Sequence, residues 1–198
     1  VIGSELHSHG LDKTTRGRGV SVIFGDGAGA AVVSREEDTS KGILSTHLHS
    51  QGEFAEELVV KAPGMGTRWV TDIISENDPN DESYFPYMNG QFVFKNAVVR
   101  FSEVIMQGLE KNKLSVSDIN MLIPHQANLR IAQFIQRKFK LNDDQVFNNI
   151  QKYGNTTAAS IPIALTEAWE EGKIKEGDLV VLAAFGSGFT WGSVIIRW

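Results

Sequence analysis

The clearest hydrophobic patterns lie in the second half of the 198-residue chain, where apolar runs alternate with segments of helical periodicity. Apolar side chains recur at spacings of three and four residues between Gln91 and Lys111, which predicts an amphipathic helix with one buried face. Further helices are predicted at 128–140 and 158–171, and strands at the runs 121–124, 145–149, 178–184 and 191–198. This alternation predicts a layered α/β architecture with a mixed sheet.

The first half is patterned as short strands joined by polar loops. Strands are predicted at 1–6, 19–24, 30–33, 42–49 and 57–61, and a polar stretch at 72–87 is predicted to be a surface excursion or a seam between two halves. Gly25-Asp26-Gly27-Ala28-Gly29 stands between the second and third of these strands. Its three glycines require either a tight connection with positive φ angles or a close approach of another backbone.

Four predicted elements end in turns that carry unusual residues. These turns hold His125, Asn155, the glycines at 25–29 and the sequence Gly186-Ser187-Gly188. Loops at one edge of an α/β sheet are a usual place for a site. An imidazole and a carboxamide can both donate hydrogen bonds to a carbonyl oxygen that gains negative charge, and a glycine turn can add a backbone N–H. The pattern therefore favours acyl chemistry through an oxyanion or enolate.

Each of these residues also has a purely structural interpretation. His125 can be a strand-end histidine that is satisfied by a backbone carbonyl. Asn155, between a glycine and a threonine, can be a helix cap or a turn residue, and Gly186-Ser187-Gly188 can be an ordinary hairpin turn. Taken one at a time, the residues leave both interpretations open.

Composition narrows the classes of function. The net charge of −5, from 19 basic and 24 acidic residues, argues against general affinity for nucleic acid. No apolar run approaches the ~20 residues needed to cross a bilayer, and the first residues lack a signal-peptide pattern, so the cytoplasm is the expected compartment. Cysteine is absent, which excludes disulfides, thiolate metal sites and a cysteine nucleophile within this chain.

Two other motifs are weak signals. The pairs His7/His9 and His47/His49 can each present imidazoles on one strand face, but no acidic or thiolate partner stands at a metal-binding spacing, so surface histidines and no metal are expected. Gly27-Ala28-Gly29 leads into a predicted strand, whereas a dinucleotide fingerprint opens a helix. We therefore expect neither a metal nor a dinucleotide cofactor.

The helix predicted after His125 carries a local positive cluster on an acidic protein. The cluster consists of Arg130, Arg137, Lys138 and Lys140, and Lys95 can join it. One interpretation is a solvated face with cations near a helix C-terminus. The other is an electrostatic dock for an acidic partner or a phosphate-bearing ligand.

Together the motifs resemble the C-terminal part of β-ketoacyl-[acyl carrier protein] synthase III, a thiolase-fold condensing enzyme of bacterial fatty acid synthesis. The matching stretches are VIFGDGAGAA at 22–31, IPHQANLRI at 123–131, GNTTAASIP at 154–162 and AFGSGFTWG at 184–192. They occur in the family's order and extend over almost the whole chain. The resemblance implies a layered thiolase-like fold with mixed sheets, represented by its C-terminal half and the last strands of its N-terminal half.

The resemblance also implies residue roles. His125 and Asn155 look like the histidine and asparagine that hold the malonyl thioester carbonyl during decarboxylation and stabilise the enolate. The turn Gly186-Ser187-Gly188 looks like the source of an oxyanion-hole N–H, with Ser187 where the family often has Gly or Ala. The remaining implied contacts are Asn128 to the pantetheine arm, Phe185 beside the malonyl carboxylate and Arg18 near the adenine of coenzyme A. The resemblance also places the family's carrier-protein docking site at Lys95, Arg130, Arg137 and Lys138.

One departure from the family is decisive for activity. The family's nucleophile is a cysteine on a buried helix upstream of the first strand seen here, and this chain has no cysteine. A thiol ester must form before the malonyl carbanion can capture the acyl group, so the chain alone is expected to be inactive in the full condensation. The first strands would also leave unpaired edges, so we expect a preceding segment or a companion chain to complete the sheet.

The expected organisation has three parts. Residues 1–35 are tail strands of an N-terminal thiolase-like half, 36–90 are connecting strands and the surface excursion, and 91–198 form the C-terminal half with the active-site His and Asn. The expected activity is acyl transfer: Claisen condensation of an acyl-CoA with malonyl carrier protein, by a homodimer in its intact form and without a cofactor. The alternatives are a non-catalytic thiolase-fold subunit that binds a carrier protein, and a related enzyme that forms polyketides or ketones.

Overall fold

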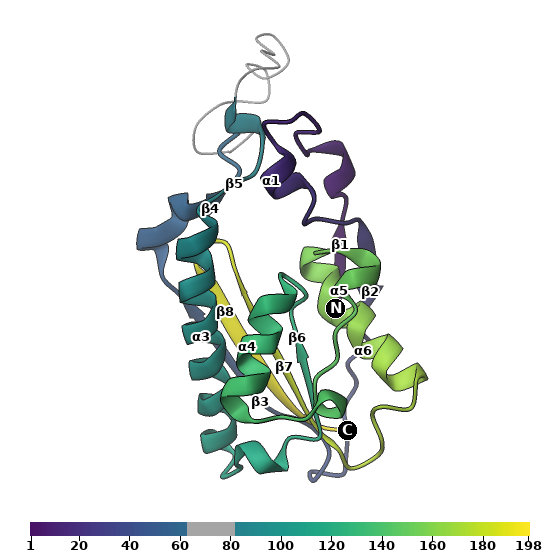
Figure 1. Cartoon of the computed structure of the whole chain (residues 1–198). Helices are drawn as coiled ribbons and strands as arrows, with labels where there is room; N and C mark the ends of the chain where they lie inside the picture. The colour runs from purple at the N-terminus through teal and green to yellow at the C-terminus, as the bar shows by residue number, and fades with distance from the viewer. Residues whose placement is uncertain (63–81) are drawn as a thin grey trace.

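A four-stranded mixed sheet forms the centre of the structure, a computed structural model that describes residues 1–62 and 82–198 (Figure 1). Its strand order is β3 (Gly42–Ser50), β8 (Thr190–Arg197), β7 (Leu179–Gly186) and β6 (Met121–Pro124). β6 and β7 are parallel, whereas β8 is antiparallel to both of its neighbours. The predicted mixed sheet is therefore present, and its parallel pair carries His125 at one end.

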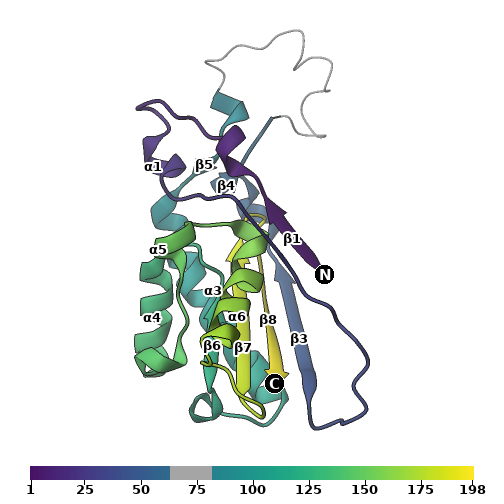
Figure 2. The ribbon, with the colours of Figure 1, turned by 90° about the vertical axis from the view of Figure 1, so that its right-hand side faces the viewer.

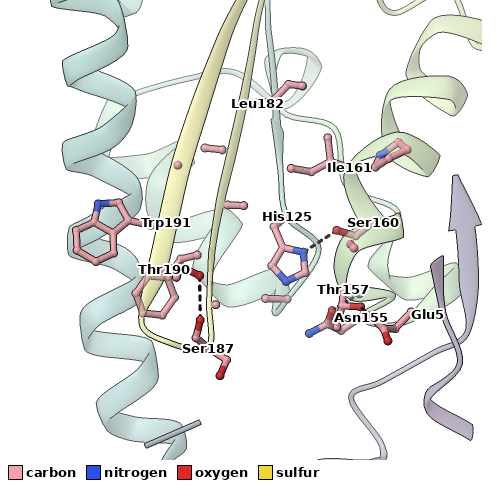
Figure 3. A pocket seen from close by; sticks show the side chains of 18 of the residues that line it. Glu5, His125, Asn155, Thr157, Ser160, Ile161, Leu182, Ser187, Thr190 and Trp191 are labelled. Carbon is pink, nitrogen blue, oxygen red and sulfur yellow. Dashed lines mark hydrogen bonds between the residues drawn. The ribbon is translucent and has the colours of Figure 1, made fainter. Parts of the chain in front are cut away.

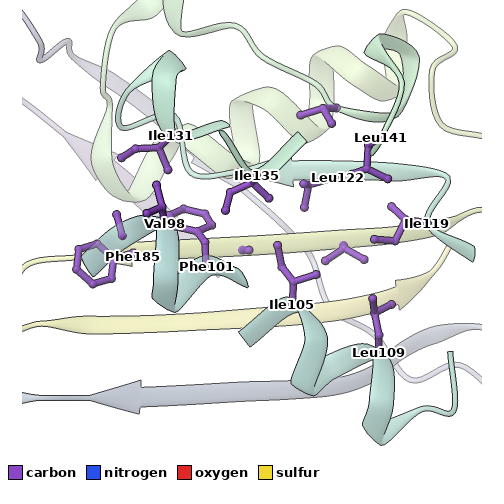
Figure 4. Close-up of a cluster of buried hydrophobic side chains, with 14 of the residues drawn as sticks. Val98, Phe101, Ile105, Leu109, Ile119, Leu122, Ile131, Ile135, Leu141 and Phe185 are labelled. Atoms are coloured by element: carbon purple, nitrogen blue, oxygen red, sulfur yellow. The ribbon is translucent and has the colours of Figure 1, made fainter. Parts of the chain in front are cut away.

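Two helices, α3 (Gly90–Lys111) and α4 (Leu129–Phe139), cover one face of this sheet (Figures 1 and 4). The predicted periodicity of α3 places Phe101, Ile105 and Leu109 in the core, where each is 0% exposed. Ile135 of α4 and Leu122 of β6 pack into the same cluster. Burial of this apolar stripe is the main stabilising term for both helices.

The opposite face of the sheet is covered in part by α6 (Ser160–Glu170). Met121 and Ile123, which alternate with Leu122 along β6, point to this second face and pack with Ala164 and Ala168 of α6. The β3 side of the same face lies beyond α6, and its Leu48 is 82% exposed. The described residues thus cover the face under α3 and α4 more fully than the face under α6.

A separate ribbon of β1 (Ile2–Glu5) and β2 (Gly27–Ala30) packs beside α6 (Figure 2). A Cβ atom on Gly29 would lie 2.5 Å from Pro162 Cβ, and one on Gly3 would lie 2.4 Å from the Ala158 carbonyl oxygen. These glycines therefore allow the ribbon to approach the start of α6. Of the two explanations for the glycine-rich sequence, close backbone approach is the correct one.

The strand predicted at 19–24 is wrong. Residues Arg18–Ser21 form the short helix α1, Val22 is 79% exposed, and only Phe24 makes a β-bridge, with Asn155. A β-branched run needs a neighbouring strand to satisfy its backbone, and the described residues offer it one bridge. Likewise β2 ends at Ala30, so the strand predicted at 30–33 is wrong, and Val32 is 97% exposed.

The remaining elements are short. They are η1 (His7–His9), η2 (Gly52–Glu57), β4 (Leu58–Val59), η3 (Glu82–Tyr84), β5 (Tyr87–Met88), η4 (Val116–Asp118), η5 (Asp143–Gln145), α5 (Ile150–Tyr153) and η6 (Thr157–Ala159). The strand predicted at 145–149 is wrong, because only Val146 bridges to Leu122. Most of the stretch 72–87 lies outside the described residues. Within 1–62 and 82–198, no helix has the length and apolar character needed to cross a membrane.

Candidate active site

A cavity of about 1850 Å³ lies between the N-terminal ribbon, the partly covered sheet face and the start of α6. His125, Asn155, Gly186 and Ser187 all line it, so three of the four turns singled out in the sequence meet in one place. Most of its remaining lining is apolar, including Leu182 of β7 and Ile161 of α6 (Figure 3). Such a cavity with a few convergent polar groups is the usual form of a ligand site.

His125 is held at the end of β6 by a backbone bond and a side-chain bond. Its backbone N–H donates to the Ala183 carbonyl at 2.7 Å, which extends the β6–β7 pairing to the histidine. Its Nδ1 lies 2.6 Å from Ser160 Oγ at the start of α6 (Figure 3). Burial lowers the pKa of the imidazole to about 4, so His125 is neutral at physiological pH.

Asn155 is fixed by its backbone and by its side-chain oxygen. Its N–H donates to the Ile23 carbonyl at 2.8 Å, and its carbonyl accepts from Gly25 N–H at 3.0 Å. Its Oδ1 accepts from Thr157 N–H at 2.8 Å, so the side-chain oxygen has the structural role of a turn residue. The amide nitrogen points into the pocket (Figure 3) and remains available as a donor.

Gln126 joins the loop of His125 to the segment that leads to Asn155. The side chain is 3% exposed, and its Nε2 donates to the carbonyls of Pro124 at 2.7 Å and Phe147 at 3.3 Å. Its Oε1 accepts from the N–H groups of Asn149 at 3.1 Å and Ile150 at 3.2 Å. One buried amide thus binds four backbone groups on both sides of the site.

Sequence reasoning missed three residues that support the site: Gln126, Ser160 and Glu5. Ser160 contacts His125, and Glu5 of β1 accepts a hydrogen bond from the Thr157 hydroxyl two residues after Asn155. Gln126 and Ser160 lie within the two motifs that contain His125 and Asn155, and their burial is the signal that identifies them. The burial of a polar side chain such as Gln126 or Ser160 depends on the folded structure and cannot be predicted from residue type alone.

The glycine turn faces the cavity from the opposite side (Figure 3). Ser187 Oγ donates to the Leu58 carbonyl at 2.5 Å, and Thr190 Oγ1 donates to the Ser187 carbonyl at 2.9 Å. Gly188 has a φ of +131°, a conformation that favours glycine. Two side-chain hydrogen bonds thus hold the turn, and its assignment as an oxyanion-hole donor stays a prediction.

The other predicted contact residues are divided between the cavity and the surface. Asn128 caps α4 by accepting from Arg130 N–H at 2.9 Å and lines the cavity, as does buried Phe185. Arg18 opens α1 and is not part of the cavity lining. The four residues predicted to dock a carrier protein are exposed on the adjacent helices α3 and α4: Lys95, Arg130, Arg137 and Lys138.

The histidine pairs do not converge. His47 Nε2 lies 2.9 Å from Ser45 Oγ, and His49 Nε2 lies 2.6 Å from Gln107 Oε1. The His7 ring contacts the Phe24 ring in a tilted arrangement, with ring centroids 4.3 Å apart. Among residues 1–62 and 82–198, no cluster of three or more His, Cys, Asp or Glu side chains has the arrangement of a metal site.

Two family models match the chain. The model described as 3-Oxoacyl-[acyl-carrier-protein (ACP)] synthase III matches residues 1–52, and the model described as 3-Oxoacyl-[acyl-carrier-protein (ACP)] synthase III C terminal matches residues 109–198. The second range contains His125, Asn155 and the glycine turn. The first range contains the ribbon and β3.

Known β-ketoacyl- and 3-oxoacyl-[acyl-carrier-protein] synthases III are similar to this chain over its whole length. The β-ketoacyl-[acyl-carrier-protein] synthases III of Rhodospirillum centenum and Clostridioides difficile are 44% and 45% identical to it over 201 residues, an alignment that covers 100% of this chain and 58% of each relative. The crystal structure of 3-oxoacyl-[acyl-carrier-protein] synthase III from Aquifex aeolicus is 41% identical, with a TM-score of 0.85, and this chain covers 57% of it. The chain therefore spans a little over half the length of these relatives.

Proposed function

The chain belongs to the 3-oxoacyl-[acyl-carrier-protein] synthase III family, and we propose that it supplies the decarboxylation half of a condensing active site. The observation that carries this proposal is the convergence of His125 and Asn155 on one cavity from two separate elements. The substrates of the intact enzyme are an acyl-CoA and a malonyl carrier protein. No cofactor beyond these thioesters is part of the proposal.

The proposed step is the decarboxylation of the malonyl thioester. The bond between the malonyl carboxylate and the methylene carbon breaks, carbon dioxide leaves, and the electron pair moves onto the thioester carbonyl oxygen as an enolate. The neutral imidazole of His125 and the amide of Asn155 each donate a hydrogen bond to that oxygen. Preorganised donors of this kind stabilise charge that develops in the transition state.

Ser160 determines which nitrogen of His125 carries the proton in this proposal. The Gln126 N–H points to Ser160 Oγ at 3.5 Å, and we propose that the Ser160 hydroxyl donates its proton to Nδ1 of His125, 2.6 Å away. Nδ1 is then the acceptor, and Nε2 holds the proton. We assign His125 as the Nε2–H tautomer, which is the form that can donate into the cavity.

The next step needs a nucleophile that this chain does not contain. The enolate carbon attacks an acyl thioester held on a cysteine, the thiolate leaves, and the 3-oxoacyl product forms. The chain has no cysteine, so we propose that this residue comes from a further segment or companion chain that enters the apolar cavity. We also propose that the intact enzyme is a cytoplasmic homodimer and that the acidic carrier protein docks on Arg130, Arg137 and Lys138.

The proposed decarboxylation is tested with malonyl carrier protein and this chain, by following carbon dioxide release and the conversion of the malonyl to an acetyl thioester by mass spectrometry. His125→Ala and Asn155→Ala are each expected to lower the rate by about 100- to 1000-fold, because each removes one oxyanion donor. His9→Ala, which removes an exposed imidazole outside the cavity, is the matched control. A rate that survives in His125→Ala would contradict the role given to His125.

A second candidate function is a non-catalytic thiolase-fold subunit, and the absence of cysteine is the observation that favours it. The same assay separates the two candidates. If the wild-type chain binds malonyl carrier protein but releases no carbon dioxide, and no associated chain gains an acyl adduct from acyl-CoA, the non-catalytic candidate is correct. The intact His125–Asn155 pair favours the catalytic candidate.

A further inference from the structure

The distance between His125 and Asn155 depends on two loops that are far apart in the sequence. His125 follows β6, and Asn155 follows the single-turn helix α5 and Gly154. α5 starts at Ile150 and its C-cap Gly154 has a φ of +69°, so α5 positions Asn155 together with the backbone bonds of Asn155 to Ile23 and Gly25. A donor pair that stabilises one oxygen atom needs both loops in a fixed relation.

Gln126 is the side chain that spans both loops. On the His125 side, it follows that residue directly and its Nε2 donates to the Pro124 carbonyl at 2.7 Å. On the Asn155 side, its Oε1 accepts from the first N–H groups of α5, those of Asn149 and Ile150. These groups at a helix start have no partner within the helix, so the amide satisfies donors that would otherwise be buried and unpaired.

The α5 side of this link is braced from α6. Asn149 Nδ2 donates to Glu167 Oε2 at 2.9 Å, and the hydroxyl of Tyr153 also donates to Glu167. α6 in turn carries Ser160, which contacts His125. Gln126 therefore closes a ring of contacts that runs from β6 through α5 and α6 and returns to His125.

We propose that Gln126 is a positioning residue that fixes the separation of the His125 and Asn155 donors through its four bonds to the backbone. The proposal rests on the proposed function for its kinetic consequence. Gln126 does not contact the substrate; it acts by holding two residues that do. Removing its bonds displaces α5 and with it Asn155, whereas the cavity that binds the malonyl arm stays in place.

The first test is Gln126→Leu, with Gln133→Leu on the exposed side of α4 as the matched control. Because misplacement of a catalytic group by about 1 Å costs about 100-fold in rate, kcat for malonyl decarboxylation is expected to fall by about 10- to 100-fold. KM for malonyl carrier protein is expected to change less than about threefold, because the enolate is stabilised only in the transition state. A loss confined to KM, or equal losses in both variants, would overturn the proposal.

The second test is Gln126→Glu, which remains informative if the leucine variant does not fold. An ionised glutamate keeps the two acceptor bonds but repels the carbonyls of Pro124 and Phe147, whereas a protonated glutamate regains one donor. The charged and titratable neighbours are His125, neutral above about pH 4, and Glu167 beyond Asn149. Decarboxylation by Gln126→Glu is expected to rise several-fold from pH 8 to pH 5.5 relative to wild type, and a flat ratio would overturn the proposal.

A structural measurement separates this proposal from the proposed function. In ¹⁵N-labelled protein, the side-chain amide resonances of Asn155 are expected to shift in Gln126→Leu and to stay unchanged in Gln133→Leu. If the wild-type chain releases no carbon dioxide but the Asn155 resonances shift, the proposed function fails and the positioning role stands. If these resonances do not shift, the positioning role is wrong whatever the activity is.

Discussion

At the scale of the residue, His125 links the chemistry of the site to the stability of the chain. Burial lowers its pKa from 6.5 to about 4. As the pH falls, the imidazole therefore binds a proton at a higher pH in the unfolded chain than in the native state. Between these two values the unfolded state binds more protons than the native state. The contribution of neutral His125 to the free energy of unfolding is therefore fully present above pH 6.5 and is lost as the pH falls toward 4.

His125→Phe is expected to flatten this pH dependence. The free energy of unfolding of the wild type should fall by at most about 3 kcal/mol more than that of the variant between pH 7 and pH 4, at about 1.4 kcal/mol for each unit of pKa shift. Urea denaturation at several pH values measures the difference. His47, whose pKa burial also lowers, remains in both proteins and cancels in the comparison. Parallel curves for the two proteins would show that His125 is not held neutral by burial.

At the scale of the element, the N-terminal ribbon depends on glycine to reach α6. A Cβ atom on Gly29 would meet Pro162 Cβ at 2.5 Å, whereas a Cβ atom on Gly10 has nothing within 4 Å. Overpacking of a tight contact costs about 1–3 kcal/mol. Gly29→Ala is therefore expected to destabilise the chain by about that amount, and Gly10→Ala to change its stability little.

Hydrogen exchange locates the effect of these two substitutions. In Gly29→Ala the amides of β1 and β2 should lose protection before those of β7 and β8, because the main contacts of the ribbon among the described elements are with α6 and η6 and not with the central sheet. Uniform loss of protection across the chain, or equal effects of Gly29→Ala and Gly10→Ala, would contradict this account of the glycines.

The sequence was sufficient for those elements whose apolar side chains face a core within the chain. The spacing of Phe101, Ile105 and Leu109 predicted α3, as the structure confirms. The run at 19–24 failed because a strand is defined by its neighbour, and periodicity carries no information about that neighbour. The thiolase-like fold class is confirmed by the similarity to the Aquifex aeolicus structure.

The site was predictable to the extent that residue type reveals chemistry. His125 and Asn155 were singled out as an imidazole and an amide at turns, their roles came from the resemblance to the family, and the structure brings both to one cavity. Gln126 and Ser160 were missed because their importance lies in which backbone and ring atoms they reach across the fold. The placement of Arg18 away from the cavity lining likewise depends on tertiary structure.

At the scale of the whole molecule, the described residues leave one apolar surface uncovered. Leu48 of β3 is 82% exposed, Ile43 is 51% exposed, and Val1 beside the ribbon is 84% exposed, and all three line the same cavity. Contiguous apolar surface of this kind marks an interaction site or an aggregation liability. It is also the surface that the proposed further segment would cover.

This surface predicts that the chain alone self-associates and binds an apolar dye, and that Leu48→Lys weakens both. Because Leu48 is already exposed, the substitution should change the free energy of unfolding by less than about 0.5 kcal/mol. Trp169→Lys is the control, since Trp169 is 57% exposed on α6 but does not line the cavity. Sedimentation velocity and dye fluorescence on the two variants distinguish association through the cavity face from nonspecific association through any exposed apolar residue. If Trp169→Lys lowers self-association as much as Leu48→Lys does, the cavity face is not the surface through which the chain associates.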